Sequence, residues 1–279
     1  MKQVGTVAQL RQAVSCFNGE TALVPTMGNI HDGHLALVRH ASELSRHVVV
    51  SIFVNPMQFD RKQDLQTYPR TLDQDLTLLQ NAGVDLVFTP AENIIYPKSV
   101  AAHTRVEVPG ISDIFCGESR PGHFVGVSTV VCKLFNMVQP RVAVFGKKDF
   151  QQLLIVKRMV EDLAIPVELA GVDTVREADG LAMSSRNNYL DEHQRQIAPA
   201  LYHALRTTAD ALERGARDFP ALEQTAAGQI ASAGLKPDYF SIRRASDLGE
   251  PKQDEQELVI LGAAFVGMAR LIDNLEVHL

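Results

Sequence analysis

The sequence predicts an α/β fold: a Rossmann-like parallel sheet with helices on both faces, plus a smaller C-terminal α+β domain. Apolar, β-branched runs alternate with helical patterns up to residue 174, and such alternation is typical of right-handed βαβ crossovers. Beyond that point two helical patterns precede three strand patterns. We therefore expect one domain over residues 1–174 and a second over residues 175–279.

Each strand of the first domain is expected from a short apolar run. Residues 48–54 are apolar except for Ser51 and rich in valine, as is typical of a strand buried on both faces. The predicted strands are 21–24, 48–54, 86–89, 142–145 and 167–172. The predicted helices are 32–45, a leucine repeat over 72–79 that ends before Gly83, 125–138 and 150–163. Ligands of such sheets bind beyond the carboxyl ends of the strands, so the loops that follow strands are the interesting ones.

The second domain is expected to combine two helices with a small antiparallel sheet. Helical patterns cover residues 191–214 and 219–233 and are separated by Gly215. Strand patterns cover 239–244, 257–266 and 271–277, and a turn joins the last two.

Composition excludes several classes of protein. The 279 residues include 27 basic and 33 acidic side chains, which gives a net charge of −6. A negative net charge disfavours a nucleic-acid binder. The apolar runs are shorter than the roughly 20 residues of a membrane span, and the N-terminus lacks a signal-peptide core. Three cysteines form no CxxC pair, so reduced thiols and a cytoplasmic location are expected.

The most informative segment is PTMGNIHDGH at residues 25–34, between a predicted strand and a predicted helix. A helix start offers unpaired backbone N–H groups that favour phosphate, and Gly28 and Gly33 let the backbone approach a ligand closely. His31 and His34 can donate hydrogen bonds as charge builds on a phosphoryl group. A zinc site is the weaker reading, because no third ligand is evident. The HxGH pattern resembles the HIGH-type signature of nucleotidylyl transferases.

Two later segments supply further donors for phosphate. MSSRN at residues 183–187 combines two hydroxyls with a guanidinium, which suits a phosphate clamp like the KMSKS-type loop of that superfamily. GKKDFQQ at 146–152 begins where a predicted strand ends. Taken alone, each could be an ordinary turn. The absence of GxxxxGK[ST] and GxGxxG from the sequence argues against P-loop kinases and NAD enzymes.

Six ordered motifs resemble one family. PTMGNIHDGH, FVNPMQF, YPRT, RPGHF, GKKDFQQ and DGLAMSSRN, with ARLIDN near the C-terminus, are similar to the pantothenate synthetases. That family joins pantoate to β-alanine with ATP. The resemblance implies adenylation of the pantoate carboxylate with loss of pyrophosphate, then attack by the β-alanine amine with release of AMP.

The resemblance also implies roles for individual residues. His34, as the proton donor, and His31, Lys148 and Arg186 are the expected catalytic residues. The expected ATP site comprises Met27, Gly28, Asn29, Ile30, His31, Asp32, Gly33, His34, Gly146, Lys147, Lys148, Asp149, Val175, Met183, Ser184, Ser185 and Arg186. Thr26, Gln58 and Gln152 are expected to hold pantoate, with Gln58 also near β-alanine. Tyr68, Arg120 and His123 match motif positions near the site.

Two positions depart from the family or leave a role open. Lys147 stands where many relatives have Glu, which leaves its part in ATP binding open. Mg²⁺ is expected with ATP, and Asp75, in the acidic stretch after YPRT, is the better candidate for a magnesium ligand.

The HxGH segment is also compatible with two competing functions, and the chain is expected to have a lid domain and to form a dimer. A nucleotidylyltransferase that keeps a dinucleotide product would release pyrophosphate but no AMP, and a non-catalytic nucleotide sensor would bind ATP without turnover. Residues 175–279 are expected to act as a lid that protects the acyl-adenylate from water. The resemblance suggests a homodimer, and the strand and helix patterns of residues 104–138 are candidates for its interface.

Overall fold

The computed structural model describes residues 1–59 and 62–279. It contains two compact units: unit 1 is Met1–Lys147 with Gln151–Asp173, and unit 2 is Lys148–Phe150 with Thr174–Leu279. In the described part of the chain, every helix is too short or too polar to cross a membrane.

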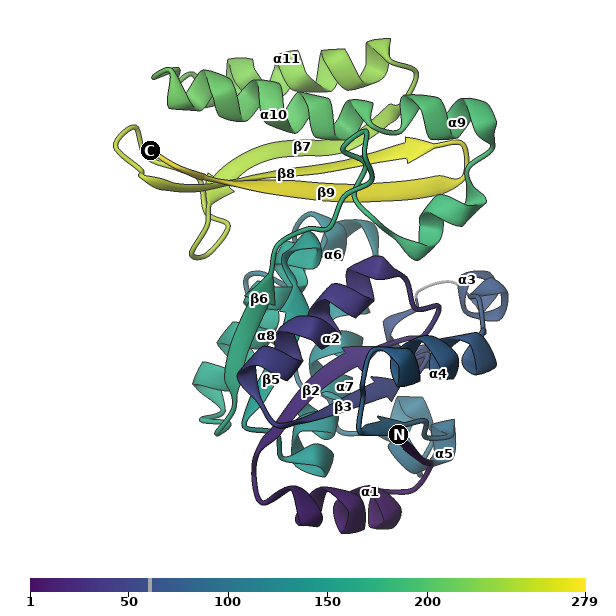
Figure 1. The fold of residues 1–279 in the computed structure, drawn as a ribbon. Helices are drawn as coiled ribbons and strands as arrows, with labels where there is room; N and C mark the ends of the chain where they lie inside the picture. Colours follow the sequence, from purple (N-terminus) through teal and green to yellow (C-terminus); the bar gives the residue numbers. More distant parts are fainter. Residues whose placement is uncertain (60–61) are drawn as a thin grey trace. The chain divides into compact units, whose positions relative to one another are not determined.

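The described residues of unit 1 form a parallel sheet of six strands (Figure 1). The strands are β1 (Lys2–Val4), β2 (Thr21–Thr26), β3 (His47–Ile52), β4 (Leu86–Phe88), β5 (Val142–Gly146) and β6 (Glu168–Val172). Their order is β1-β4-β3-β2-β5-β6, and every neighbouring pair is parallel. This confirms the predicted sheet. The edge strand β1 was not predicted, because three residues are too few to show a strand pattern.

Helices cover the two faces of this sheet. They are α1 (Val7–Val14), α2 (Asp32–Leu44), α3 (Lys62–Thr67), α4 (Leu72–Asn81), α5 (Glu92–Ile95), α6 (Cys116–Ser119), α7 (His123–Val138) and α8 (Phe150–Asp162). Short 3₁₀ turns are η1 (Ser15–Phe17), η2 (Pro56–Gln58), η3 (Val100–Ala102) and η4 (Lys147–Asp149). On one face Val24 and Val144 pack with Val38 of α2. Phe145 points to the opposite face, since side chains alternate along a strand, and its ring contacts Phe135 of α7.

The strand order places a topological switch point beside β2. β2 pairs with β3 on one side and with β5 on the other, so the connections leave in opposite directions there. Ligands of open parallel sheets bind in the crevice at such a point, outside the carboxyl ends of the strands. The loops after β2, β3 and β5 therefore share one edge of the sheet.

Unit 2 packs two helices on one face of an antiparallel sheet (Figure 1). Its elements are η5 (Ser185–Tyr189), α9 (Glu192–Ile197), α10 (Ala200–Glu213), α11 (Phe219–Ser232), β7 (Lys236–Arg244), β8 (Glu257–Val266) and β9 (Ala269–His278). Leu205, Ile230 and Ile260 lie in the core between the layers. The antiparallel sheet is confirmed. The single helix expected over 191–214 was wrong: it breaks at Pro199, which lacks the N–H that a continuous helix needs.

Candidate active site

The two histidines of HxGH begin helix α2 as a reciprocal cap. Nδ1 of His31 accepts from the Gly33 N–H at 3.1 Å, and Nδ1 of His34 accepts from the His31 N–H at 3.4 Å. Their ring centroids lie 4.1 Å apart. Because each Nδ1 is an acceptor, each neutral ring carries its proton on Nε2. The cap therefore selects the tautomer that leaves an Nε2–H on each of two neighbouring rings at a helix N-terminus.

The loop between β2 and α2 is anchored by a buried carboxylate. Asp75 of α4 accepts from the Asn29 N–H at 3.0 Å and the Ile30 N–H at 2.8 Å, and the Thr71 hydroxyl donates to it at 3.0 Å. Gly28 has φ +82°, and a Cβ there would lie 2.9 Å from Asp75 Oδ2. Glycine is thus required both by the backbone conformation and by the close carboxylate.

These hydrogen bonds bear on the expected magnesium ligand. Asp75 is 2% exposed, and both of its oxygens already accept from N–H or O–H donors, whose partial positive charge a cation would meet. Within residues 1–59 and 62–279, no group of three or more His, Cys, Asp or Glu side chains could hold a metal ion. Asp75 as a magnesium ligand stays a prediction, and its environment fits a loop anchor better.

Gln58, after β3, has an amide whose orientation is set by Asn55. Oδ1 of Asn55 accepts from the Met57 N–H, and its Nδ2 donates to the Gly126 carbonyl, so the backbone fixes which atom is which. The same Nδ2 donates to Gln58 Oε1 at 3.0 Å. Gln58 Nε2 therefore points the other way, and it donates to Met27 Sδ. Gln58 presents a donor towards the loop after β2.

Asn55 and Tyr96 extend this network, and sequence reasoning gave neither a role. Asn55 is 1% exposed, and the Tyr96 hydroxyl donates to its Oδ1 at 2.7 Å. Burial, reinforced by Glu92, raises the pKa of Tyr96, so this hydroxyl keeps its proton. For Asn55, a signal was available: an Asn that precedes Pro56 directly after a buried strand caps the following turn. Tyr96 left no local signal.

The predicted neighbours Arg120 and His123 hold the backbone of Gln58. Its carbonyl accepts from His123 Nδ1 at 2.8 Å and from Arg120 Nη2 at 3.2 Å. Since a carbonyl only accepts, His123 Nδ1 carries the proton, and Nε2 accepts from Arg120 Nη1. Tyr68 packs edge-on against Phe59.

The remaining pantoate candidates of unit 1 differ in their surroundings. The Thr26 hydroxyl, at the carboxyl end of β2, already has two partners: it donates to the Ser51 carbonyl and accepts from the Gly28 N–H. Gln151 is buried and bonded to the backbone of Ile111, Ile114 and Cys116. Its neighbour Gln152 is only partly buried. Of the two adjacent amides, Gln152 is thus the less buried, and its contact with pantoate stays a prediction.

Lys147, whose part in ATP binding the sequence left open, forms an ion pair. Its ammonium lies 2.8 Å from Asp173 Oδ1 beyond the end of β6. The Asp173 side chain is 89% exposed, so this pair contributes little to stability. It does direct the Lys147 side chain towards β6.

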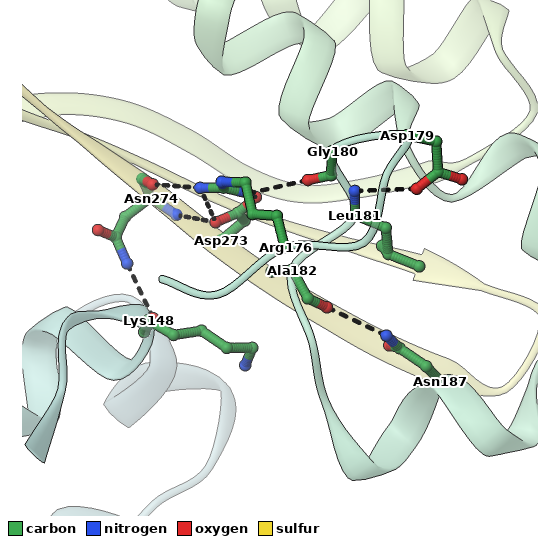
Figure 2. Close-up of polar contacts among 9 residues, drawn as sticks. All are labelled: Lys148, Arg176, Asp179, Gly180, Leu181, Ala182, Asn187, Asp273 and Asn274. Atoms are coloured by element: carbon green, nitrogen blue, oxygen red, sulfur yellow. Dashed lines mark hydrogen bonds and ion pairs between the residues drawn. The ribbon is translucent and has the colours of Figure 1, made fainter. Parts of the chain in front are cut away.

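In unit 2 the predicted phosphate ligands surround one pocket. Lys148, Ser184 and Arg186 line it together with Arg270 and Asp273. The Ser184 hydroxyl accepts from the Arg186 N–H at 3.2 Å and so caps η5. Figure 2 shows Lys148 and the segment that carries Ala182 and Asn187, which line this pocket as well. Arg270 is already paired with Asp238 at 2.7 Å, so Lys148 and Arg186 are the cationic side chains here that are candidates to meet an anionic group such as phosphate.

Comparison with known proteins matches the chain to one family over nearly its whole length. A family model described as Pantoate-beta-alanine ligase matches residues 2–276. The pantothenate synthetase of Thioalkalivibrio sulfidiphilus is 59% identical, over 100% of this chain and 99% of that protein. The crystal structure of the Thermus thermophilus pantothenate synthetase has a TM-score of 0.95 at 44% identity, covering 100% of both chains. A Francisella tularensis pantoate-beta-alanine ligase, complexed with beta-gamma ATP and beta-alanine, has a TM-score of 0.81 at 34% identity, covering 99% of this chain and 97% of that one.

Proposed function

Because the chain belongs to the pantoate–β-alanine ligase family, we propose that it makes pantothenate from pantoate and β-alanine with ATP as the energy source. A pantoate carboxylate oxygen bonds to the α-phosphorus, and pyrophosphate leaves. The β-alanine amine then bonds to the acyl carbon of this pantoyl adenylate, AMP leaves with the electron pair, and the amine loses a proton. The family match over residues 2–276 carries the proposal, and the ligands of the Francisella enzyme support it.

The histidine pair is the group proposed to act on phosphate. Nε2–H of His34 donates to the phosphoryl oxygens as negative charge builds during departure of pyrophosphate, and His31 does the same beside it. Their Nδ1 atoms are held by the backbone, so neither ring must reorient. Lys148 and Arg186 add positive charge for the outer phosphates.

The two glutamines are proposed to orient pantoate. Gln58 Nε2, directed towards the loop after β2 by Asn55, donates to an oxygen of pantoate, and Gln152 gives a second contact. Neutral amides can hold a carboxylate without a charge pair that would weaken it as a nucleophile. The same argument accounts for the lack of a cationic side chain in the expected pantoate set.

One assay tests the function. The protein is incubated with ATP and pantoate, with and without β-alanine, and pyrophosphate, AMP and pantothenate are each measured. We expect pyrophosphate without β-alanine to be limited to about one equivalent of enzyme, and all three products in equal amounts with it. A product that retains AMP would indicate a dinucleotide-forming transferase, and ATP binding without turnover a nucleotide sensor.

Four further expectations remain proposals. Magnesium should be required with ATP, and the chain should form a homodimer in the cytoplasm. All three cysteines are free thiols, which is consistent with the reducing conditions of the cytoplasm. Residues 175–279 are proposed to act as a lid domain; identical small-angle scattering with and without ATP plus pantoate would contradict closure.

A further inference from the structure

Arg176 and Asp273 form a buried ion pair in unit 2 that sequence reasoning gave no role. The guanidinium donates to both carboxylate oxygens, at 2.6 and 3.0 Å, and the Asp273 side chain is 3% exposed. The same guanidinium donates to the carbonyls of Gly180 and Asn274, at 3.1 and 3.3 Å. Figure 2 shows these contacts converging on Arg176 from the hairpin of residues 175–183 and from β9.

The ring of Tyr202, from α10, packs against this guanidinium. Arg176 Cζ lies 3.9 Å from the centre of the Tyr202 ring, within the range of a cation–π contact. Gly180, at φ +91°, lies so close to the ring that a Cβ would come within 2.3 Å of it. The hairpin is therefore held against α10 as well as β9, and its orientation is determined by the planar fork of Arg176.

Asn274 extends the network from Asp273 to Lys148. Its backbone N–H donates to Asp273 Oδ1 at 2.8 Å, and its side-chain Nδ2 donates to the Lys148 carbonyl at 2.8 Å. The Lys148 side chain extends away from Asn274 (Figure 2). One carboxylate thus holds, through Arg176, the hairpin and, through Asn274, the backbone of a lysine proposed to bind phosphate.

Hydrogen bonds also fix residues 184–186, the serine–arginine segment that follows the hairpin, relative to the hairpin. The Met183 N–H donates to the Val175 carbonyl at 2.9 Å, which closes the hairpin. Asn187 Nδ2 then donates to the Ala182 carbonyl at 3.1 Å. Residues 184–186 are thereby fixed at both ends.

We propose that Arg176, Asp273 and Asn274 are positioning residues for the nucleotide phosphates: together they hold the backbone of Lys148 and residues 184–186 at a fixed separation. This inference rests on the proposed function only in taking ATP as the ligand. A purely stabilising role would explain the pair less well, because apolar residues of similar volume often stabilise a protein as much as a buried ion pair does. They cannot, however, join three backbone segments by directed hydrogen bonds.

Two variants test the proposal. Asn274→Leu removes the hydrogen bond to Lys148 and leaves the ion pair in place. Loss of one such bond should raise the KM for ATP about fivefold. The double variant Arg176→Met/Asp273→Asn removes both charges together, so no buried charge is left alone. It should raise the KM for ATP at least about tenfold. In both variants the KM for β-alanine should stay within about twofold of the parent value, because none of these groups is proposed to contact β-alanine.

The matched control is a second ion pair of unit 2. Arg243 and Glu223 lie 2.9 Å apart, with side chains 22% and 24% exposed, and join β7 to α11. Arg243→Met/Glu223→Gln should leave the KM for ATP unchanged, whatever it does to the melting temperature.

A binding measurement separates this inference from the proposed function. Binding of a non-hydrolysable ATP analogue is measured by the shift that it causes in melting temperature. If the parent protein makes no pantothenate, the proposed function fails, and the binding data still test the positioning residues. A weakened analogue shift in Asn274→Leu and in the double variant supports the proposal. Parent-like ATP affinity in a folded Asn274→Leu overturns it, and so does an equal loss in the control. If the double variant does not fold, Asn274→Leu decides.

Discussion

Asn55 Nδ2 donates to Gln58 Oε1 at 3.0 Å, and this contact decides which end of the Gln58 amide faces the loop after β2. Asn55 cannot be turned over, because a backbone N–H and a backbone carbonyl define its own orientation. Gln58 therefore offers Nε2 as a donor, which suits the carboxylate or hydroxyl oxygens of pantoate.

Gln58→Glu tests this orientation. A carboxylate replaces the amide donor with an acceptor that repels the pantoate carboxylate, so the KM for pantoate should rise about 30-fold or more, with the KM for ATP little changed. Gln58→Ala should give a smaller rise, since it removes the donor without adding repulsion. Initial-rate measurements with each substrate varied check both. A change confined to ATP would show that the site has been divided wrongly.

His34→Ala should abolish most of the adenylation step. Loss of a donor to the developing phosphate charge costs about 100- to 1,000-fold in rate, so pyrophosphate release should fall by that factor while pantoate binding largely survives. His40→Ala is the matched control, because His40 lies on the same helix and pairs with Glu43 near the surface. Near-normal pyrophosphate release by His34→Ala is incompatible with the assigned role.

Asp75→Asn distinguishes a loop anchor from a magnesium ligand. The amide can accept only at one atom, so one of the Asn29 and Ile30 N–H bonds is lost, and the free energy of unfolding should fall by about 1–3 kcal/mol. Activity should fall as well, and added Mg²⁺ should not restore it. Denaturant unfolding and a magnesium titration of the rate measure the two effects. Rescue by high Mg²⁺ at unchanged stability would instead favour a metal ligand.

Arg176→Met should destabilise the protein in a pH-dependent way. Burial raises the pKa of Asp273, and Arg176 offsets part of that rise. Without the guanidinium the folded-state pKa rises further above the unfolded value of about 3.9. A carboxyl raised in this way contributes stability below its unfolded-state pKa, which is lost as pH rises through the folded-state pKa.

The deficit of Arg176→Met relative to the parent should therefore grow with pH. It should be smaller at pH 5 than at pH 8, where it should reach about 3–5 kcal/mol, the usual effect of leaving a buried charge alone. Urea unfolding at the two pH values measures it. A deficit that is equal at both would mean that Asp273 is not the titrating group. Arg176→Met/Asp273→Asn, which carries neither charge, should show little of this pH dependence.

Local pattern was enough for the parallel sheet, the second antiparallel sheet and the placement of HxGH between β2 and α2. Strand and helix periodicity, turn residues and caps act within a few residues of each other, so the sequence by itself determines them. The break at Pro199 has a local cause as well, because proline lacks the N–H that a continuous helix needs.

The tertiary structure alone decided which polar groups meet. Asp75 anchors a loop 45 residues away in the sequence, and Arg176 finds Asp273 at a separation of 97 residues. Gln151 and Gln152 are adjacent and chemically identical, and packing turned one into the core and left the other partly exposed. No local pattern encodes such choices, because the free energy of a buried polar contact depends on the partner that long-range packing brings to it.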